Sequence, residues 1–190
     1  MQKDKIYKVS KVLRSYKSPV FDLDDFDDSL QGGQWKKIRN HINSLMKNHD
    51  VQVNDCRNVQ KDMLLKLVEE WSRSRSSLVS KSWKVYFRNF VMNDFRGCGV
   101  TRCLMIDGEP CSISAGWKIP NSELYYSSIG IHNYKYNGLG ELAYVDELKE
   151  LKMKGFRFVD LGGSERRFLD FKKKFNPQDA HSSVFYWIKK

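Results

Sequence analysis

The sequence lacks the features of a membrane or secreted protein. No apolar run approaches the roughly 18 residues that a membrane helix needs, and residues 1–7 are polar, with no apolar core for a secretory signal. Cysteine and proline are scarce, with four of each in 190 residues, and there is no C-x-x-C pair. Internal repeats and low-complexity tracts are absent as well. These absences predict a reduced, cytoplasmic protein.

The four cysteines do not predict a metal site. Cys98, Cys103 and Cys111 would need a fourth ligand to bind zinc, and the spacing does not suggest one. A chain of this length buries a sizeable core and does not need disulfide bonds to fold. We therefore expect buried or idle thiols and no metal.

Positive charge and aromatic side chains are abundant. Lys and Arg number 33 against 23 Asp and Glu, a net charge of +10, and the 5 Trp, 9 Tyr and 11 Phe argue against disorder. The charge favours anionic partners: a CoA-type nucleotide, tRNA or another nucleic acid, or an anionic membrane surface. We expect one domain over residues 34–190, preceded by a basic and then acidic segment over 1–33. The acidic part, residues 22–28, reads either as a solvated loop or as a cover over basic surface.

Apolar periodicity predicts an α/β (α+β) fold, in which helices flank a mixed, mostly antiparallel sheet. Helical spacing indicates helices that begin near Trp35, Lys61 and Ser82 and, later in the chain, helices over 139–154 and 167–175. Alternation predicts strands over residues 100–106, 111–119, 124–132, 156–161 and 183–188.

The segment from His132 to Gly140 is the most informative one for a ligand. A predicted strand ends there and an amphipathic helix begins, with two glycines at positions 138 and 140. Glycines allow close approach of the backbone, and the start of a helix directs free N–H groups outward, which suits a pyrophosphate. The alternative interpretation is a plain turn that uses glycine for its geometry.

This segment also resembles a known family. Lys135-x-x-Gly138-x-Gly140 is similar to the Q/R-x-x-G-x-G/A loop of GNAT acyltransferases, with Lys in place of the usual Gln or Arg. The resemblance implies a single GNAT-like domain in which the loop holds the pyrophosphate of CoA. The implied cofactor-binding residues are Lys135, Tyr136, Asn137, Gly138, Leu139 and Gly140.

A second resemblance concerns the C-terminal part. The stretch from Phe158 to Ser164, FVDLGGS, and the following stretch from Phe168 to Pro177, FLDFKKKFNP, are similar to the last lobe of Fem-type peptidyltransferases and to phosphatidylglycerol lysyltransferase catalytic domains. Residues 35–43 also resemble the helix that opens the catalytic half of the latter. Those enzymes take an aminoacyl group from tRNA, so the donor is either acyl-CoA or aminoacyl-tRNA.

Three residues are candidates for catalysis in such a transfer. The acceptor attacks an ester or thioester carbonyl, so the site must stabilise an oxyanion and accept a proton. Lys172 is a candidate for the oxyanion, with a phosphate contact or a solvated lysine as alternatives. His132 and Glu141 are candidates for the base. A structural histidine and an acid placed by the helix dipole are the corresponding alternatives.

Four further residues are candidates for substrate contacts: Tyr134, Ser164, Arg166 and Arg167. Ser164 follows a predicted strand and precedes a helix, so it also suits an N-cap. We therefore expect an enzyme, an acyltransferase that moves an acyl or aminoacyl group to an amine or hydroxyl. The alternative is a non-catalytic binding module on the same scaffold that recognises RNA or an anionic lipid head group.

Overall fold

The fold is described from a computed structural model covering residues 8–74, 81–162, 166–177 and 179–189. By its internal contacts the chain forms two compact units. One comprises residues 22–159 and the other comprises residues 1–21 and 160–190. The domain boundary expected at residue 33 stays a prediction.

The larger unit is built on a mostly antiparallel sheet. Strands β2 (Val51–Asn54), β3 (Val100–Ile106), β5 (Ser112–Lys118) and β6 (Leu124–His132) are adjacent in that order, and each pairs antiparallel with the next. The short β4 (Glu109–Pro110) pairs with β3, and β7 (Phe158–Asp160) follows β6 in the strand order. The predicted strands over 100–106 and 124–132 are confirmed to the residue.

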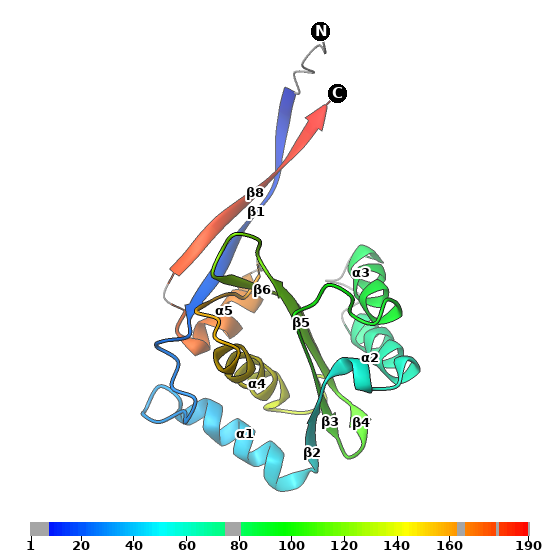
Figure 1. The fold of residues 1–190 in the computed structure, drawn as a ribbon, viewed down its shortest axis with the longest axis vertical. Helices are drawn as coiled ribbons and strands as arrows, with labels where there is room; N and C mark the ends of the chain where they lie inside the picture. The colour runs from blue at the N-terminus through cyan, green and yellow to red at the C-terminus, as the bar shows by residue number, and fades with distance from the viewer. Residues whose placement is uncertain (1–7, 75–80, 163–165, 178, 190) are drawn as a thin grey trace. The chain divides into compact units, whose positions relative to one another are not determined.

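Helices cover both faces of this sheet. On one face lie α1 (Lys36–Asn48) and α4 (Leu139–Met153), and on the other α2 (Lys61–Ser74) and α3 (Lys81–Met92) (Figure 1). Each helix buries an apolar stripe against the sheet, which removes that surface from water. Two core clusters result. One joins α2 and α3 to the sheet and includes Leu64, Trp71, Phe87 and Ile113; the other joins α1 and α4 to it and includes Leu45, Ile106 and Leu139.

The smaller unit contains a long antiparallel pair of strands and one short helix. Strand β1 (Lys8–Asp22) pairs antiparallel with β8 (Asp179–Lys189), from Lys8 opposite Lys189 to Val20 opposite Asp179. Helix α5 (Arg166–Lys172) continues into a single 3₁₀ turn, Lys173–Phe175. The backbone N–H of Leu161 donates to the carbonyl of Pro19 at 3.0 Å.

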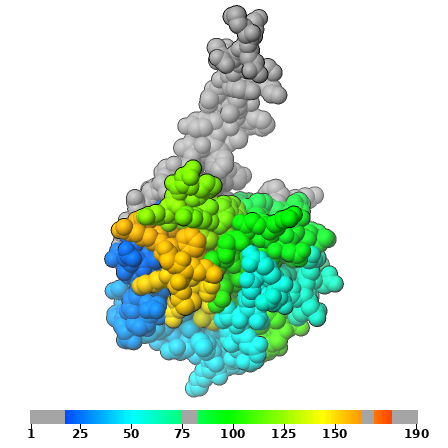
Figure 2. Space-filling view, in the orientation of Figure 1, coloured from blue at the N-terminus to red at the C-terminus, as the bar shows by residue number. Residues whose placement is uncertain are grey.

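Strands β1 and β2 were not predicted from the sequence. The acidic segment, residues 22–28, is packed against the core and is not a fully solvated loop. Leu23 and Phe26 are each only 1% exposed. The ammonium group of Lys152 donates to the carbonyl of Phe26 at 2.7 Å, and the guanidinium of Arg157 lies 3.4 Å from a carboxylate oxygen of Asp24. Figure 2 shows the orange surface that follows α4 directly beside the blue surface of this segment. The apolar residues between the aspartates therefore anchor the segment to the core.

The predicted fold class is confirmed: helices flank one mixed, mostly antiparallel, open sheet. Within the described ranges, no helix has the length and apolar character needed to cross a bilayer.

Candidate functional site

The turn between β6 and α4 is the centre of the candidate site. The side chain of Asn133 accepts a hydrogen bond from the backbone N–H of Lys135 at 3.0 Å, which is an Asx turn that starts the reversal of the chain. The ammonium group of Lys135 lies 5.5 Å from the centre of the Tyr136 ring. Lys135 and Asn137 are exposed, whereas Leu139 and Gly140 are buried. The exposed half of the predicted loop is thus open to a ligand.

Gly138 is glycine for a reason that does not involve a ligand. It is the N-cap of α4 and has a φ of 88°, a backbone conformation that residues other than glycine rarely adopt. A Cβ atom at this position would lie 2.5 Å from the backbone carbonyl oxygen of His41 in α1. The close approach of α1 therefore explains this glycine, as the plain-turn interpretation of the loop allowed.

His41 and Glu141 lie within hydrogen-bond distance of each other at the start of α4. The Nδ1 atom of His41 lies 3.2 Å from Oε1 of Glu141, and the side chains are 27% and 9% exposed. A carboxylate in the first turn of a helix is stabilised by the helix dipole. Glu141, a candidate base, lies just past the predicted loop, in the first turn of α4. No sequence signal linked it to His41, a hundred residues earlier.

A small cleft borders the same turn. Its volume is about 160 Å³, and it is lined by residues of the turn and of α2: Asn133, Tyr134, Lys135, Leu67, Glu70, Trp71 and Ser74. The ring of Tyr134 is 4.5 Å from that of His132, centre to centre. His132, Tyr134 and the loop from Lys135 to Gly140 thus lie together at this turn. Their roles stay predictions.

Strand β6 carries a bulge that sequence reasoning did not find. Ala115 pairs with Ile129 but the next residue, Gly116, pairs with Ser127, so one residue of β6 has no opposite partner. The hydroxyl of Ser127 donates to Oε2 of the buried Glu147 at 3.0 Å, and Ser128 lies 2.9 Å from the hydroxyl of Tyr86. A Cβ atom at Gly116 would lie 2.0 Å from the carbonyl oxygen of Tyr126. Bulges re-aim side chains and are over-represented next to active sites.

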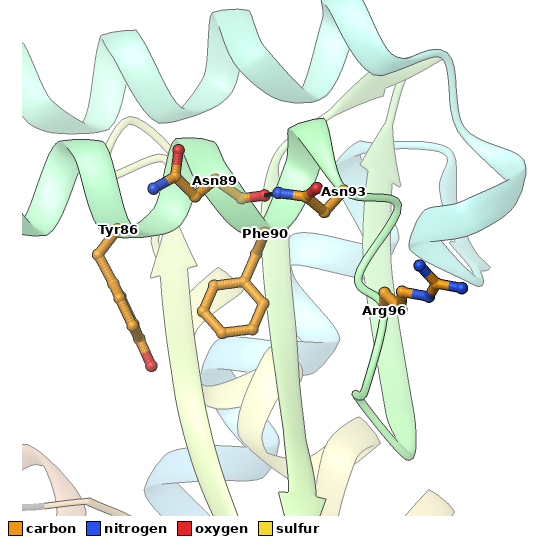
Figure 3. A pocket seen from close by; sticks show the side chains of 5 residues that line it. All are labelled: Tyr86, Asn89, Phe90, Asn93 and Arg96. Atoms are coloured by element: carbon orange, nitrogen blue, oxygen red, sulfur yellow. Dashed lines mark hydrogen bonds between the residues drawn. The ribbon is translucent and has the colours of Figure 1, made fainter.

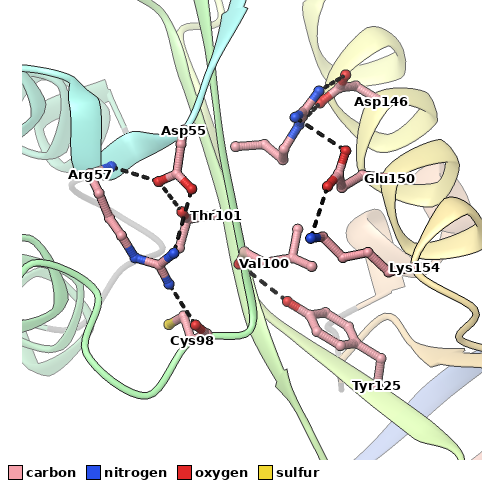
Figure 4. A network of polar contacts seen from close by, with 10 residues as sticks. Asp55, Arg57, Cys98, Val100, Thr101, Tyr125, Asp146, Glu150 and Lys154 are labelled. Atoms are coloured by element: carbon pink, nitrogen blue, oxygen red, sulfur yellow. Dashed lines mark hydrogen bonds and ion pairs between the residues drawn. The ribbon is translucent and has the colours of Figure 1, made fainter.

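An ionic network fastens α4 to the sheet (Figure 4). The guanidinium of Arg102 on β3 makes two hydrogen bonds to the carboxylate of Asp146, at 2.7 and 2.8 Å, and lies 3.3 Å from Glu150. Its hydrogen bond to Asp146 raises the pKa of Arg102 above the ordinary value. A fork of this kind fixes the position of the helix along the strand, because both N–H groups must be met at once.

The remaining candidates belong to the smaller unit. Lys172 is buried, and its ammonium group donates to the backbone carbonyls of Leu161 and Gly162. These contacts show that Lys172 ties α5 to the segment after β7. Arg166 and Arg167 open α5, although their side chains are not described, and Ser164 lies outside the described residues. The catalytic and substrate-binding roles of these four residues stay predictions.

The four cysteines are buried as free thiols. Burial raises the pKa of Cys111 to about 11 and also raises that of Cys98. Among the described residues, no three potential ligands from Cys, His, Asp and Glu gather into a metal site.

Comparison with known proteins now adds to this geometry. A family model, "Phosphatidylglycerol lysyltransferase, C-terminal", matches residues 5–183. The chain belongs to this family. The match covers nearly the whole chain, so it includes the β6–α4 turn, the β6 bulge and the α5 region together. No curated protein sequence matches the chain.

Solved structures show the same fold at low sequence identity. A conserved protein of unknown function from Bacteroides thetaiotaomicron matches with a TM-score of 0.70 and 15% identity, over 99% of this chain and 64% of that one. The L-PGS structure from Bacillus licheniformis matches with a TM-score of 0.64 and 13% identity, over 92% and 61%. A tandem GNAT protein from the clavulanic acid biosynthesis pathway matches with a TM-score of 0.57 and 10% identity, over 96% and 55%.

The suspected relationship to phosphatidylglycerol lysyltransferase domains is confirmed, and the chain shares the fold of a GNAT protein. The chain spans about three fifths of the length of the first structures it matches. Family and fold together support an acyltransferase.

Proposed function

We propose that this domain transfers an aminoacyl group from aminoacyl-tRNA to a hydroxyl group of phosphatidylglycerol. The family match supports the reaction class and the lipid acceptor. The net charge of +10 suits both a polyanionic donor and an anionic head group. Acyl-CoA, the other donor that the sequence allowed, is less well supported.

The observation that carries the choice of donor is the environment of the helix start. The Glu141 carboxylate lies in the first turn of α4, next to His41 of α1, at the place where a pyrophosphate would need free N–H groups. Gly138, whose missing side chain suggested room for such a ligand, is packed against the backbone of His41 instead. A diphosphate approaching this turn would meet a buried carboxylate, and like charges repel.

The chemistry would proceed by direct attack. The lipid hydroxyl oxygen attacks the ester carbonyl of the aminoacyl group and loses its proton to a base, for which Glu141 and His132 are the candidates. The tetrahedral oxyanion collapses, the bond to the ribose oxygen of the tRNA breaks, and that oxygen takes up a proton. The domain would orient donor and acceptor and stabilise the oxyanion.

Parallel calorimetric titrations with CoA, acetyl-CoA and aminoacyl-tRNA test the choice of donor. We expect heat with aminoacyl-tRNA and none with either CoA compound. Transfer is then measured by incubating the protein with radiolabelled lysyl-tRNA and phosphatidylglycerol vesicles and separating the labelled lipid. Heat with CoA alone would overturn the proposal. Binding of tRNA or lipid without transfer would favour the non-catalytic binding module.

Glu141→Gln tests the proposed base. The amide keeps the size of the side chain but does not accept a proton, so we expect turnover to fall by roughly 10²–10⁴-fold. His132→Gln is the parallel variant. If Glu141→Gln keeps full turnover and His132→Gln loses it, the base is His132. If neither variant loses turnover, both assignments are wrong.

A further inference from the structure

A groove along α3 is separate from the β6–α4 turn and has no role in the function described so far. It has a volume of about 380 Å³ and is lined by Tyr86, Asn89, Phe90, Asn93 and Arg96. Figure 3 shows Tyr86 and Phe90 projecting from one side of the helix, and Arg96 on the loop that follows it. Its walls are therefore flat aromatic rings, side-chain amides and one guanidinium.

The aromatic residues form a row that extends from α3 onto the sheet. The rings of Tyr86 and Phe90 are 4.9 Å apart, and Phe90 stacks on Trp117 of β5 at 6.0 Å with an interplanar angle of 12°. Trp117 in turn lies 5.4 Å from Tyr126 of β6. At the other end, Trp83 is 47% exposed and lies 5.8 Å from Tyr86. Tyr86 and Phe90 of this row give the groove an apolar, aromatic floor, in which most neighbouring rings meet edge to face.

The polar groups lie at the rim of this floor. Asn89 and Asn93 are exposed, and the amide of Asn93 is held by a 2.7 Å hydrogen bond to the backbone carbonyl of Asn89. Arg96 is exposed, and within the described part of the chain it makes no ion pair. Aromatic rings on which a base can stack, amides that pair with base edges, and a cation for phosphate are the three elements of nucleotide recognition.

We propose that the α3 groove binds an unpaired nucleotide, with the base against the aromatic row and the phosphate at Arg96. An acyl chain would use the apolar floor but would leave the amides without a function. The hydroxyl of Tyr86 connects the groove to Ser128 at the β6 bulge, 2.9 Å away. A nucleotide in this groove therefore lies beside the bulge. The inference rests on the proposed function in one respect only, which is the source of that nucleotide. The proposed function makes it the unpaired end of an RNA and not a free nucleotide.

Arg96→Ala is the test variant and Arg88→Ala its control. Both arginines are exposed, and each substitution removes one positive charge. Arg88, however, lies outside the groove lining, 4.0 Å from Glu69. The probes are adenosine monophosphate and a short single-stranded RNA with a 3′-terminal adenosine, measured by quenching of tryptophan fluorescence, with the RNA hairpin that pairs this adenosine as a negative probe. We expect Arg96→Ala to weaken binding of the two unpaired probes about tenfold and Arg88→Ala to change it by less than about twofold.

Each outcome decides the proposal. Tighter binding of the RNA than of the mononucleotide identifies an RNA end as the source, and equal binding identifies a free nucleotide. The proposal is overturned if the wild type binds neither probe, or if the two variants weaken binding equally. It is overturned in favour of a lipid site if Arg96→Ala weakens only binding to phosphatidylglycerol vesicles. If Arg96→Ala keeps full aminoacyl transfer and binds RNA as the wild type does, the α3 groove is not a nucleotide site. The proposed function is unaffected by that result.

Discussion

At the scale of single residues, Gly138 joins two helices that are far apart in the chain. Its positive φ turns the chain into α4, and its missing Cβ leaves room for the carbonyl of His41 in α1. Both demands fall on one residue, and only glycine meets them without strain. The same residue that looked like part of a pyrophosphate loop is thus a packing point between α1 and α4.

We expect Gly138→Ala to destabilise the protein by roughly 2–4 kcal/mol, because it combines left-handed strain with a steric clash. Gly155→Ala is the matched control, since Gly155 also has a positive φ, 76°, but a Cβ there would meet nothing within 4 Å. The control should cost only the strain, about 1–2 kcal/mol. Urea unfolding measures both. Equal losses would mean that the contact with His41 is not rigid.

The buried thiol of Cys111 makes stability depend on pH in the alkaline range. Burial raises its pKa from 9.0 to about 11 in the folded protein. The unfolded chain therefore ionises first, so this contribution is complete below pH 9 and is lost as the pH rises through 11. We expect the stability difference between wild type and Cys111→Ala to shrink by up to about 2–3 kcal/mol over this range. Thermal unfolding at a series of pH values measures it, and a constant difference would contradict it.

At the scale of elements, the fork from Arg102 to Asp146 holds α4 on β3. It matters for the site because α4 carries Glu141 at its start and Glu147 beneath the β6 bulge. If α4 slides or tilts, both carboxylates move together. The network is thus a positioning device for the candidate site as well as a contribution to stability.

We expect Arg102→Ala to destabilise the protein by about 1–3 kcal/mol, because it removes the two hydrogen bonds to Asp146 and leaves Glu150 with Lys154 only. Arg102→Lys is the informative companion, since it keeps the charge but loses the two-pronged geometry. It should recover part of the stability but not the full activity. Denaturant unfolding and the transfer assay measure the two effects. Full recovery of both by Lys would show that charge alone matters.

At the scale of the whole molecule, the excess of positive charge should govern binding of the donor. Each phosphate contact with a nucleic acid releases counterions, so the slope of log K against log salt is roughly −0.7 to −0.9 per contact. We expect a slope of about −3 or steeper for tRNA, corresponding to several contacts. Titrations at a series of salt concentrations measure it. A slope near zero would argue against an extended contact with RNA.

Local pattern in the sequence determined most of the elements of this protein. The strands over 100–106 and 124–132 and the helix from Leu139 were predictable because alternation and helical spacing are properties of neighbouring residues. The turn at Asn133 and the acid at Glu141 were recognisable for the same reason. The family resemblance likewise rested on short stretches of sequence, and the match over residues 5–183 confirmed it.

Only the tertiary structure decided the rest, because the deciding contacts join distant residues. Strand β1 has its ladder of hydrogen bonds with β8, at the opposite end of the sequence. His41 meets Glu141 across a hundred residues, and the bulge of β6 depends on the glycine opposite it at position 116. Whether Gly138 serves a ligand or a neighbouring helix depends on what fills the space beside it. That is a property of packing, and no periodicity along the chain records it.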